Sequence, residues 1–187
     1  MRTLLALVLG CLISTSAFAS APDELWRQAR IRPQDPRLAD LLRIGAARSA
    51  TFRAIVNRLE AGNLIVYVAL SPNMKAALAG KLTWMTRTGA YRYVKATINT
   101  EQSSDQMIAT LAHELQHALE VHDDESVVDQ RSLIGLYKRI GRQSSSGAIA
   151  GFETDAAQAT GFQVRRELMA SAAAAAAASR ASDSSQS

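Results

Sequence analysis

Two histidines and a glutamate lie within five consecutive residues, in the segment His113-Glu114-Leu115-Gln116-His117. Residues four apart on a helix lie one turn apart on the same face, so both imidazoles can bind one metal ion. Glu114 lies about 100° further around the helix axis than His113, where it can reach a metal-bound water without being a ligand. The spacing therefore predicts a zinc site at His113 and His117, with Glu114 as the catalytic residue.

Two histidines on one helix are more often ordinary surface or core residues than metal ligands. Three features favour the metal site: the acid at the required position, an apolar opposite face on the same helix, and a predicted β-hairpin immediately before it. The apolar face consists of Ile108, Leu111, Leu115 and Leu119. One side of the helix can thus pack in a core while the other is free for chemistry.

A catalytic zinc site usually has three protein ligands and an open fourth position. One candidate for the missing ligand is His122, although a solvated histidine near a helix end is also favoured by the helix dipole. Asp123 is another candidate, because it occupies the position of the third ligand in the extended motif of metzincins and their aspartate-bearing relatives. That motif needs a glycine to turn the chain where this sequence has Glu120.

The segment around Glu153 carries a second motif, Glu-x-x-Ala, formed by Glu153 and Ala156. With the first motif, it resembles the gluzincin group of zinc peptidases, and specifically a small bacterial member. In that group a glutamate on a second helix completes the site, and a small residue three positions later lets the two helices approach closely.

The resemblance covers residues 102–168 and implies that Glu153 is the third ligand. The alternative for Glu153 is an ordinary exposed glutamate in the first turn of a helix, where the dipole favours it. Many gluzincins carry an aspartate four positions after the ligand, which orients the first histidine. This chain has Ala157 there and Asp155 two positions after the glutamate.

With zinc held by His113, His117 and Glu153, the bound water would have a pKa of about 7, and Glu114 would take its proton during attack on a carbonyl. The predicted function is an exported zinc metallohydrolase, with peptides or proteins as substrates. Tyr137 is a candidate oxyanion donor, although packing on an amphipathic helix is the simpler explanation. The gluzincin resemblance implies a substrate lying along an edge strand, for which residues 81–87 are the candidate.

Two other functions fit the same motifs. The chain is short for a peptidase, and no segment is clearly recognisable as a second wall of a cleft. A zincin-like module that binds zinc without catalysis is therefore one alternative. A metal-dependent hydrolase of cell-wall amides is the other.

The residues of the site need a scaffold, and the hydrophobic patterns predict one. The expected elements are short helices at 38–42 and 74–79, helices at 49–60, 103–121, 127–140 and from about 151 into the alanine tract 172–178, a buried strand at 64–70, and hairpin strands at 81–87 and 91–98. Ser103 and Gln106 form a capping box at the start of the histidine-bearing helix. We expect an α+β, zincin-like fold, in which a small mostly antiparallel or mixed sheet packs on that helix and a helical part follows.

The chain divides into four predicted regions. Residues 1–19 have a charged start, an apolar run and a small-residue ending at Ala17-Phe18-Ala19, as in a signal peptide. An extended lead-in (20–36), the metallohydrolase domain (37–170) and an alanine-rich helical extension with a disordered tail (171–187, the tail being 179–187) follow. A secreted or periplasmic location is expected, and a lipoprotein anchored through Cys11 is the less favoured alternative, because Leu9 is large for a lipoprotein cleavage box.

Composition argues against two classes of partner. The net charge is +4, but the lysines and arginines are spread along the chain and form no cluster with aromatic residues, which argues against nucleic-acid binding. Beyond the first twenty residues, no apolar run approaches the roughly 18 residues that a membrane span needs. Stable membrane insertion after signal cleavage is therefore not expected.

Overall fold

The computed structural model describes residues 29–74, 78–144 and 151–184. The predicted signal peptide (1–19), with Cys11, lies outside these ranges, as do residues 75–77 of the predicted helix at 74–79. The described residues contain five helices and a mixed sheet of four strands, so the predicted α+β class with a mixed sheet is confirmed. None of the described helices combines the length and the apolarity needed to cross a membrane.

The mixed sheet forms the centre of the fold. Its strands, in spatial order, are β1 (Ile31–Pro33), β2 (Leu64–Ser71), β4 (Tyr91–Asn99) and β3 (Gly80–Thr88). β1 and β4 each run parallel to β2, whereas β3 and β4 form the predicted antiparallel hairpin. β3 therefore lies at one edge of the sheet.

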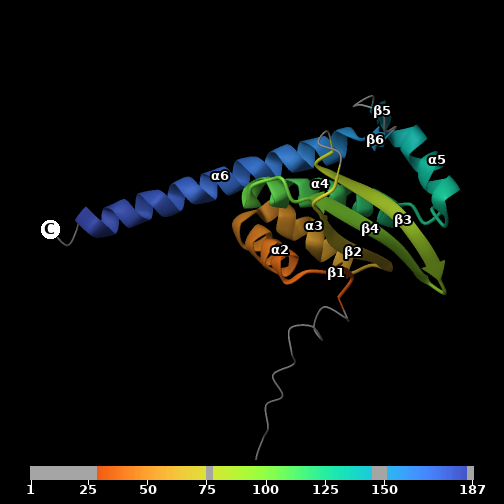
Figure 1. Ribbon diagram of the computed structural model, residues 1–187, viewed down its shortest axis with the longest axis horizontal. Coiled ribbons are helices and arrows are strands. Elements are labelled where there is room, and N and C mark those ends of the chain that lie inside the picture. The colour runs from red at the N-terminus through yellow and green to blue at the C-terminus, as the bar shows by residue number, and fades with distance from the viewer. Residues whose placement is uncertain (1–28, 75–77, 145–150, 185–187) are drawn as a thin grey trace, which may run out of the picture.

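Three helices cover one face of the sheet: α2 (Pro36–Arg48), α3 (Ala50–Glu60) and α4 (Ser104–Asp123) (Figure 1). Alternate strand residues point into the core between the layers, as the pleat requires. Val66 and Val94 face each other across β2 and β4, and both are completely buried. α4 contributes the apolar face predicted for it, since Leu111 and Leu115 are also completely buried.

The region predicted as an extended lead-in, residues 20–36, contains strand β1. Ile31 pairs with Val66 of β2 and is only 1% exposed. Glu60, at the end of α3, accepts hydrogen bonds from the backbone N–H groups of Arg30 and Ile31 at 2.7 and 2.9 Å. The sheet thus includes residues before the predicted start at 37. A strand of three residues is too short to show an alternating pattern.

α4 is held at both of its ends. The predicted capping box is present, with Gln106 N donating to Ser103 Oγ at 3.3 Å and Ser103 N donating to Gln106 Oε1 at 2.9 Å. At the other end, the buried guanidinium of Arg92 on β4 donates to the carbonyl oxygens of Val121 and His122 at 2.8 and 3.0 Å. These carbonyls belong to the last turn, which lacks partners within the helix. The sheet therefore fixes the helix that carries the histidines.

α5 (Gln130–Ile140) is shorter than its hydrophobic pattern predicts. The pattern includes Val127 and Val128, but both precede the helix. Asp129 caps α5 by accepting a hydrogen bond from Ser132 N at 2.7 Å. The capping residue, and not the apolar spacing, thus decides where this helix begins.

The last helix also begins later than predicted. Residues Gly151–Glu153 form strand β6, which pairs with β5 (Arg142–Ser144). α6 then runs from Asp155 to Ser184. Thr154 acts as its cap, because the hydroxyl oxygen accepts a hydrogen bond from Ala157 N at 3.1 Å. The predicted helix start at Gly151 is therefore wrong.

The end of α6 continues through residues that were predicted to be disordered, 179–187. Alanine has the highest helix propensity, and the hydroxyl of Ser179 donates to the carbonyl of Ala175 at 3.1 Å. The prediction of disorder is wrong for residues 179–184, and residues 185–187 lie outside the described ranges. Figure 1 shows this part of α6 projecting away from the body of the molecule.

The first half of α6 packs antiparallel against α4. Its buried stripe consists of Ala157, Val164 and Leu168, which are all 0% exposed. Arg48, at the end of α2, donates to the carbonyl of Leu168 at 2.8 Å and to the carboxylate of Asp105 on α4 at 2.7 and 3.0 Å. One guanidinium thus joins three helices, and α6 is held beside the face of α4 that carries the histidines.

Candidate metal centre

The two histidines lie next to each other on α4, as their spacing predicts. Their ring centroids are 4.9 Å apart, and the ring planes make an angle of 80°. His117 is 6% exposed and Glu114 is 4% exposed, whereas His113 is partly accessible. The helix therefore presents two imidazoles and one carboxylate at the edge of the core.

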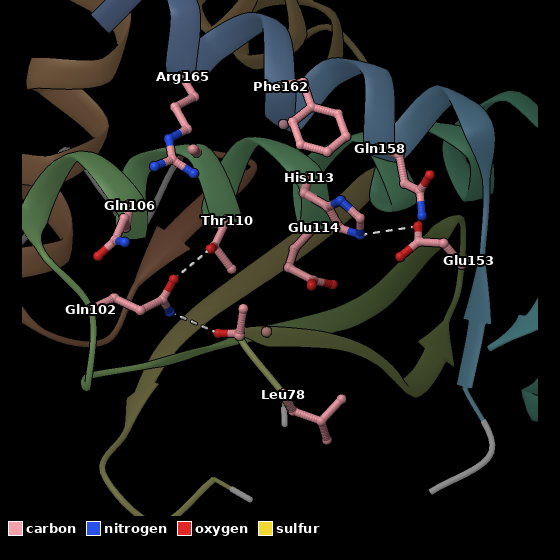
Figure 2. A pocket seen from close by; sticks show the side chains of 14 residues that line it. Leu78, Gln102, Gln106, Thr110, His113, Glu114, Glu153, Gln158, Phe162 and Arg165 are labelled. Atoms are coloured by element: carbon pink, nitrogen blue, oxygen red, sulfur yellow. Dashed lines mark hydrogen bonds and ion pairs between the residues drawn. The ribbon is translucent and has the colours of Figure 1, made fainter. Parts of the chain in front are cut away.

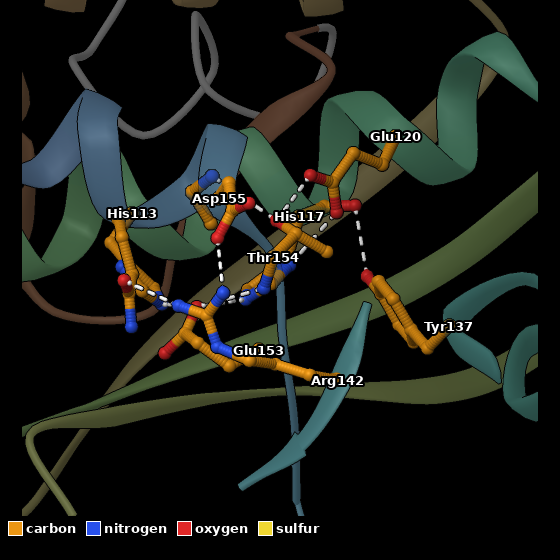
Figure 3. Close-up of polar contacts among 10 residues, drawn as sticks. His113, His117, Glu120, Tyr137, Arg142, Glu153, Thr154 and Asp155 are labelled. Carbon is orange, nitrogen blue, oxygen red and sulfur yellow. Dashed lines mark hydrogen bonds and ion pairs between the residues drawn. The ribbon is translucent and has the colours of Figure 1, made fainter. Parts of the chain in front are cut away.

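Glu153, at the end of β6, completes a group of three possible ligands. Its Oε1 lies 3.3 Å from Nε2 of His113 and 3.6 Å from Nε2 of His117. All three ligand atoms lie within 4.8 Å of one another (Figure 3). The structure thus brings the three predicted ligands together from two segments far apart in the sequence.

The donor atoms fit a divalent transition-metal ion. Two imidazole nitrogens and one carboxylate form a ligand set that such ions accept. His117 Nδ1 lies 2.9 Å from Glu120 Oε2. A carboxylate can only accept, so Nδ1 donates its hydrogen to Glu120, and Nε2 is the nitrogen that faces Glu153. The contact with Glu120 therefore orients the ring so that a metal ion can replace the proton on Nε2.

Acidic groups around His117 stabilise positive charge at this point. Burial lowers the pKa of His117, but hydrogen bonds to Glu120 and Glu153 outweigh it and raise the pKa to about 9. Burial raises the pKa of Glu153, but hydrogen bonds to His113 and His117 hold that pKa well below its ordinary range. The site is thus built to hold a cation, either a proton or a metal ion.

Glu120 and Thr154 form a second layer of contacts that sequence reasoning missed. The hydroxyl of Thr154 donates to Glu120 Oε1 at 2.6 Å, and Glu120 Oε2 accepts from His117. The backbone N–H of Thr154 also donates to Glu153 Oε1 at 3.0 Å. Thr154 therefore connects two of the three ligands. The only sequence signal was the position of Glu120, one helical turn after His117 and two turns after His113 on the same side of α4.

Glu114 lies beside the three ligands but does not belong to their group. Burial raises its pKa, and the nearby His117 and His113 lower it by less. Gly80, the first residue of β3, passes close by: a Cβ atom there would lie 2.6 Å from Glu114 Oε1 and 2.8 Å from Thr110 Cγ2. The edge strand therefore begins directly against this carboxylate, where only a glycine fits without displacement.

The contact between the two helices differs from the gluzincin pattern. Glu153 ends a strand and does not lie on a helix. Ala156, the expected small contact residue, is exposed, while Ala157 is 0% exposed. Gly161, one helical turn after Ala157, lies opposite His113. A Cβ atom at position 161 would lie 3.4 Å from the Cβ of His113. The expectation for Ala156 is thus wrong, because α6 starts at Asp155.

The other candidate ligands, Asp123 and His122, lie outside this group of three. So does Asp155, the aspartate nearest to the position that orients a histidine in gluzincins. Asp123 accepts hydrogen bonds from the guanidinium of Arg58 at 2.9 and 3.0 Å and contacts Nδ1 of His122 at 2.9 Å. Asp155 forms an ion pair with Arg142. None of these acids or His122 belongs to the ligand group formed by the described residues. The alternative with Asp123 as third ligand is therefore wrong for this structure.

Tyr137 contacts His117 through both its hydroxyl group and its ring. Its hydroxyl donates to the carbonyl oxygen of His117 at 3.1 Å. Its ring packs edge-on against the imidazole of His117, with 5.3 Å between ring centroids. The side chain is 7% exposed, and burial raises its pKa. The packing explanation is therefore confirmed, and Tyr137 has no free hydroxyl for an oxyanion.

A pocket of about 500 Å³ opens next to His113, between α4, the first half of α6 and the start of β3 (Figure 2). Its lining includes His113, Glu114 and Glu153. α6 supplies the wall opposite α4 through Gln158, Gly161, Phe162 and Arg165. The first half of α6 therefore forms the second wall of the pocket. The sequence patterns did not reveal this wall.

Comparisons with protein-family models, with curated proteins and with solved structures gave no match to this chain. Any function assigned to the site must therefore follow from its own geometry. The geometry consists of three converging ligand atoms, a buried carboxylate beside them and an open pocket along one side.

Proposed function

We propose that this chain is an exported zinc-dependent metallohydrolase that cleaves peptide bonds, with His113, His117 and Glu153 as zinc ligands. The convergence of these three residues beside the buried, non-ligating Glu114 carries the proposal. Two histidines and a glutamate form the ligand set of one class of catalytic zinc sites, and they leave one position open. A zincin-like fold and kinship with gluzincins belong to the same proposal.

The chemistry assigned to each residue follows from its surroundings. Zinc would supply Lewis acidity and lower the pKa of a water molecule to about 7. Glu114 accepts a proton from that water and delivers it to the leaving amine. Burial makes its carboxylate a stronger base than an exposed glutamate. Glu120 and Thr154 hold His117 and Glu153 in place through the hydrogen bonds described above.

An extended peptide can reach this site along β3. β3 is the edge strand of the sheet, so its outer backbone groups can pair with an added strand. Its first residue, Gly80, lies against Glu114, so a peptide lying along residues 81–87 and continuing past Gly80 enters the pocket. α6 closes the opposite side. Export of the chain is inferred from the signal-peptide pattern in residues 1–19.

Metal content of the purified chain is the first test. We expect about one zinc ion per chain, lost in Glu153→Ala and retained in Asp123→Ala, which removes an acid that binds Arg58 instead. Circular dichroism of both variants checks that they remain folded. Equal zinc in all three proteins would contradict the site.

Activity is the second test, with Glu114→Gln as the decisive variant. Denatured protein and purified peptidoglycan are offered side by side to the zinc-loaded chain. We expect cleavage of the protein, and its loss in Glu114→Gln with zinc content unchanged. Cleavage of peptidoglycan alone would move the substrate to cell-wall amides. If neither substrate is cleaved in a way that depends on Glu114, the chain would be a zinc-binding module without catalysis.

A further inference from the structure

The pocket beside the metal centre has opposite charges at its two ends. Glu114 and Glu153 lie at the end next to the histidines. Among the described residues, Arg165 is the only permanent cation in its lining, and Figure 2 shows it on the other side of His113 from Glu153. Apart from His113, the other polar side chains of the lining are neutral: Gln102, Gln106, Thr110 and Gln158.

Arg165 differs from the charged residues that follow it on α6. Arg166 donates to Gln163, and Glu167 accepts hydrogen bonds from Ser49 at 2.5 Å and from the Thr51 hydroxyl at 2.7 Å. The guanidinium of Arg165 has no hydrogen bond or ion pair with any residue that the structure describes. A guanidinium has five N–H donors in a planar fork, a geometry that matches a carboxylate.

The position of Arg165 suits a group close to the scissile bond. Gly161 lies opposite His113, and Arg165 follows one helical turn later, which is about 6 Å along the axis. Two residues of an extended peptide span about 7 Å. Phe162, 63% exposed, lies between them on the pocket side of α6 and offers an apolar surface for the stem of a side chain.

We propose that Arg165 binds a carboxylate of the substrate, and that the chain therefore selects peptides with an acidic group within about two residues of the cleaved bond. This specificity rests on the function proposed above. The carboxylate can belong to an aspartate or glutamate side chain or to the free C-terminus of the peptide. Both present the same planar anion to the guanidinium.

Cleavage assays with matched peptides distinguish a side-chain carboxylate from the carboxylate of a free C-terminus. Cut sites are first mapped in denatured casein by mass spectrometry. Synthetic peptides around one site are then made with Glu or Gln beside the bond, and with a free or amidated C-terminus. We expect kcat/KM about 10- to 100-fold higher for the acidic member of one of these pairs, the range of a charge-assisted hydrogen bond.

Arg165→Gln should abolish that preference, and Arg165→Glu should shift it toward peptides with lysine. Arg166→Gln is the matched control, because Arg166 is the next residue on the same helix and does not line the pocket. It should keep the preference. Equal cleavage of acidic and neutral peptides by the unmodified chain, or a preference that survives Arg165→Gln, would overturn the proposal.

Binding measurements separate this proposal from the proposed catalysis. The zinc-loaded Glu114→Gln protein, with and without Arg165→Gln in the same chain, is titrated by calorimetry with short peptides chosen independently of any cut site. These peptides differ in the same two ways, with Glu or Gln at one position and a free or amidated C-terminus. Tighter binding of acidic peptides that depends on Arg165 supports the inference even if no peptide is cleaved, whereas the hydrolase proposal would then fail. Affinities that do not depend on Arg165 would overturn the inference even if peptides are cleaved.

Discussion

Three glutamates lie within reach of His117, and their surroundings give each a different role. Glu153 is partly exposed and bonded to both histidines, which suits a ligand. Glu114 is buried and its pKa is raised, which suits a base. Glu120 uses both of its carboxylate oxygens, one toward His117 and one toward Thr154. Environment, and not residue type, therefore separates the proposed ligand, the proposed base and the supporting glutamate.

Glu120→Gln should weaken zinc binding about 10- to 100-fold, the usual effect of removing a partner that orients a histidine ligand. Two donors, His117 Nδ1–H and the Thr154 hydroxyl, would then compete for the single acceptor oxygen of the amide. Competition titration with a zinc-binding dye measures the affinity. Glu101→Gln, an exposed glutamate away from the site, is the control. An unchanged dissociation constant in Glu120→Gln would contradict this role.

Gly80→Ala tests the contact between the edge strand and Glu114, the proposed base. The new Cβ would lie 2.6 Å from Glu114 Oε1 and 2.8 Å from Thr110 Cγ2, so the carboxylate or the strand must move. We expect kcat to fall about 100-fold, as for other small displacements of catalytic groups. Zinc content should not change, because the ligands lie elsewhere. Gly151→Ala is the control, since a Cβ there meets no atom of the described residues within 4 Å.

At the level of elements, the sequence predicted best what depends on local pattern. The spacing of His113 and His117 and the capping box at Ser103 are local features of one helix, and both are present. The start of α6 was predicted wrongly because Gly151–Glu153 pairs with the preceding strand β5, and strands of three residues are too short to leave a periodic signal. The place of Glu153 next to the histidines was implied only by a resemblance.

Within the site, the role of Glu120 could not be predicted from the sequence either. Its contact with Thr154 joins residues far apart in the sequence, so no motif on α4 can reveal it. The charge of Glu120 alone predicts an exposed helical residue. Its role follows only once β6 and α6 are placed beside α4.

The packing of α6 on the body makes stability depend on pH through Glu167. Burial raises the pKa of Glu167, but hydrogen bonds from Ser49, Gln163 and Thr51 outweigh it and lower the pKa from 4.5 to about 2. A carboxylate with a lowered pKa in the folded state stabilises the fold above its ordinary pKa. This contribution is lost as the pH falls from about 4.5 to about 2.

We therefore expect Glu167→Gln to reduce the free energy of unfolding by about 1–2 kcal/mol at pH 7, a value discounted for partial solvent exposure. The difference from the unmodified chain should shrink to near zero at about pH 2. Urea unfolding followed by circular dichroism at several pH values measures both. Glu101→Gln is again the control. A difference that stays constant over this pH range would show that the carboxylate charge is not responsible.

At the scale of the whole molecule, the candidate ligands connect two parts of the fold, helix α4 and the C-terminal segment that begins at β6. His113 and His117 belong to α4, which the sheet holds through Arg92. Glu153 belongs to β6, which leads into α6. An ion bound to all three would join the C-terminal part to the body, in the same way that Arg48 and Glu167 do further along α6.

Zinc should therefore stabilise the whole chain. Binding to the folded state alone adds about 2.7 kcal/mol at a free zinc concentration 100 times the dissociation constant. For a domain of this size that corresponds to a melting temperature roughly 5–10 °C higher. Differential scanning calorimetry with zinc and after chelation measures the shift. Glu153→Ala should lose it, because only the two α4 ligands remain, whereas Glu114→Gln should keep it, because Glu114 is not part of the ligand group. Identical melting temperatures with zinc and chelator in the unmodified chain would show that no ion joins α4 to β6.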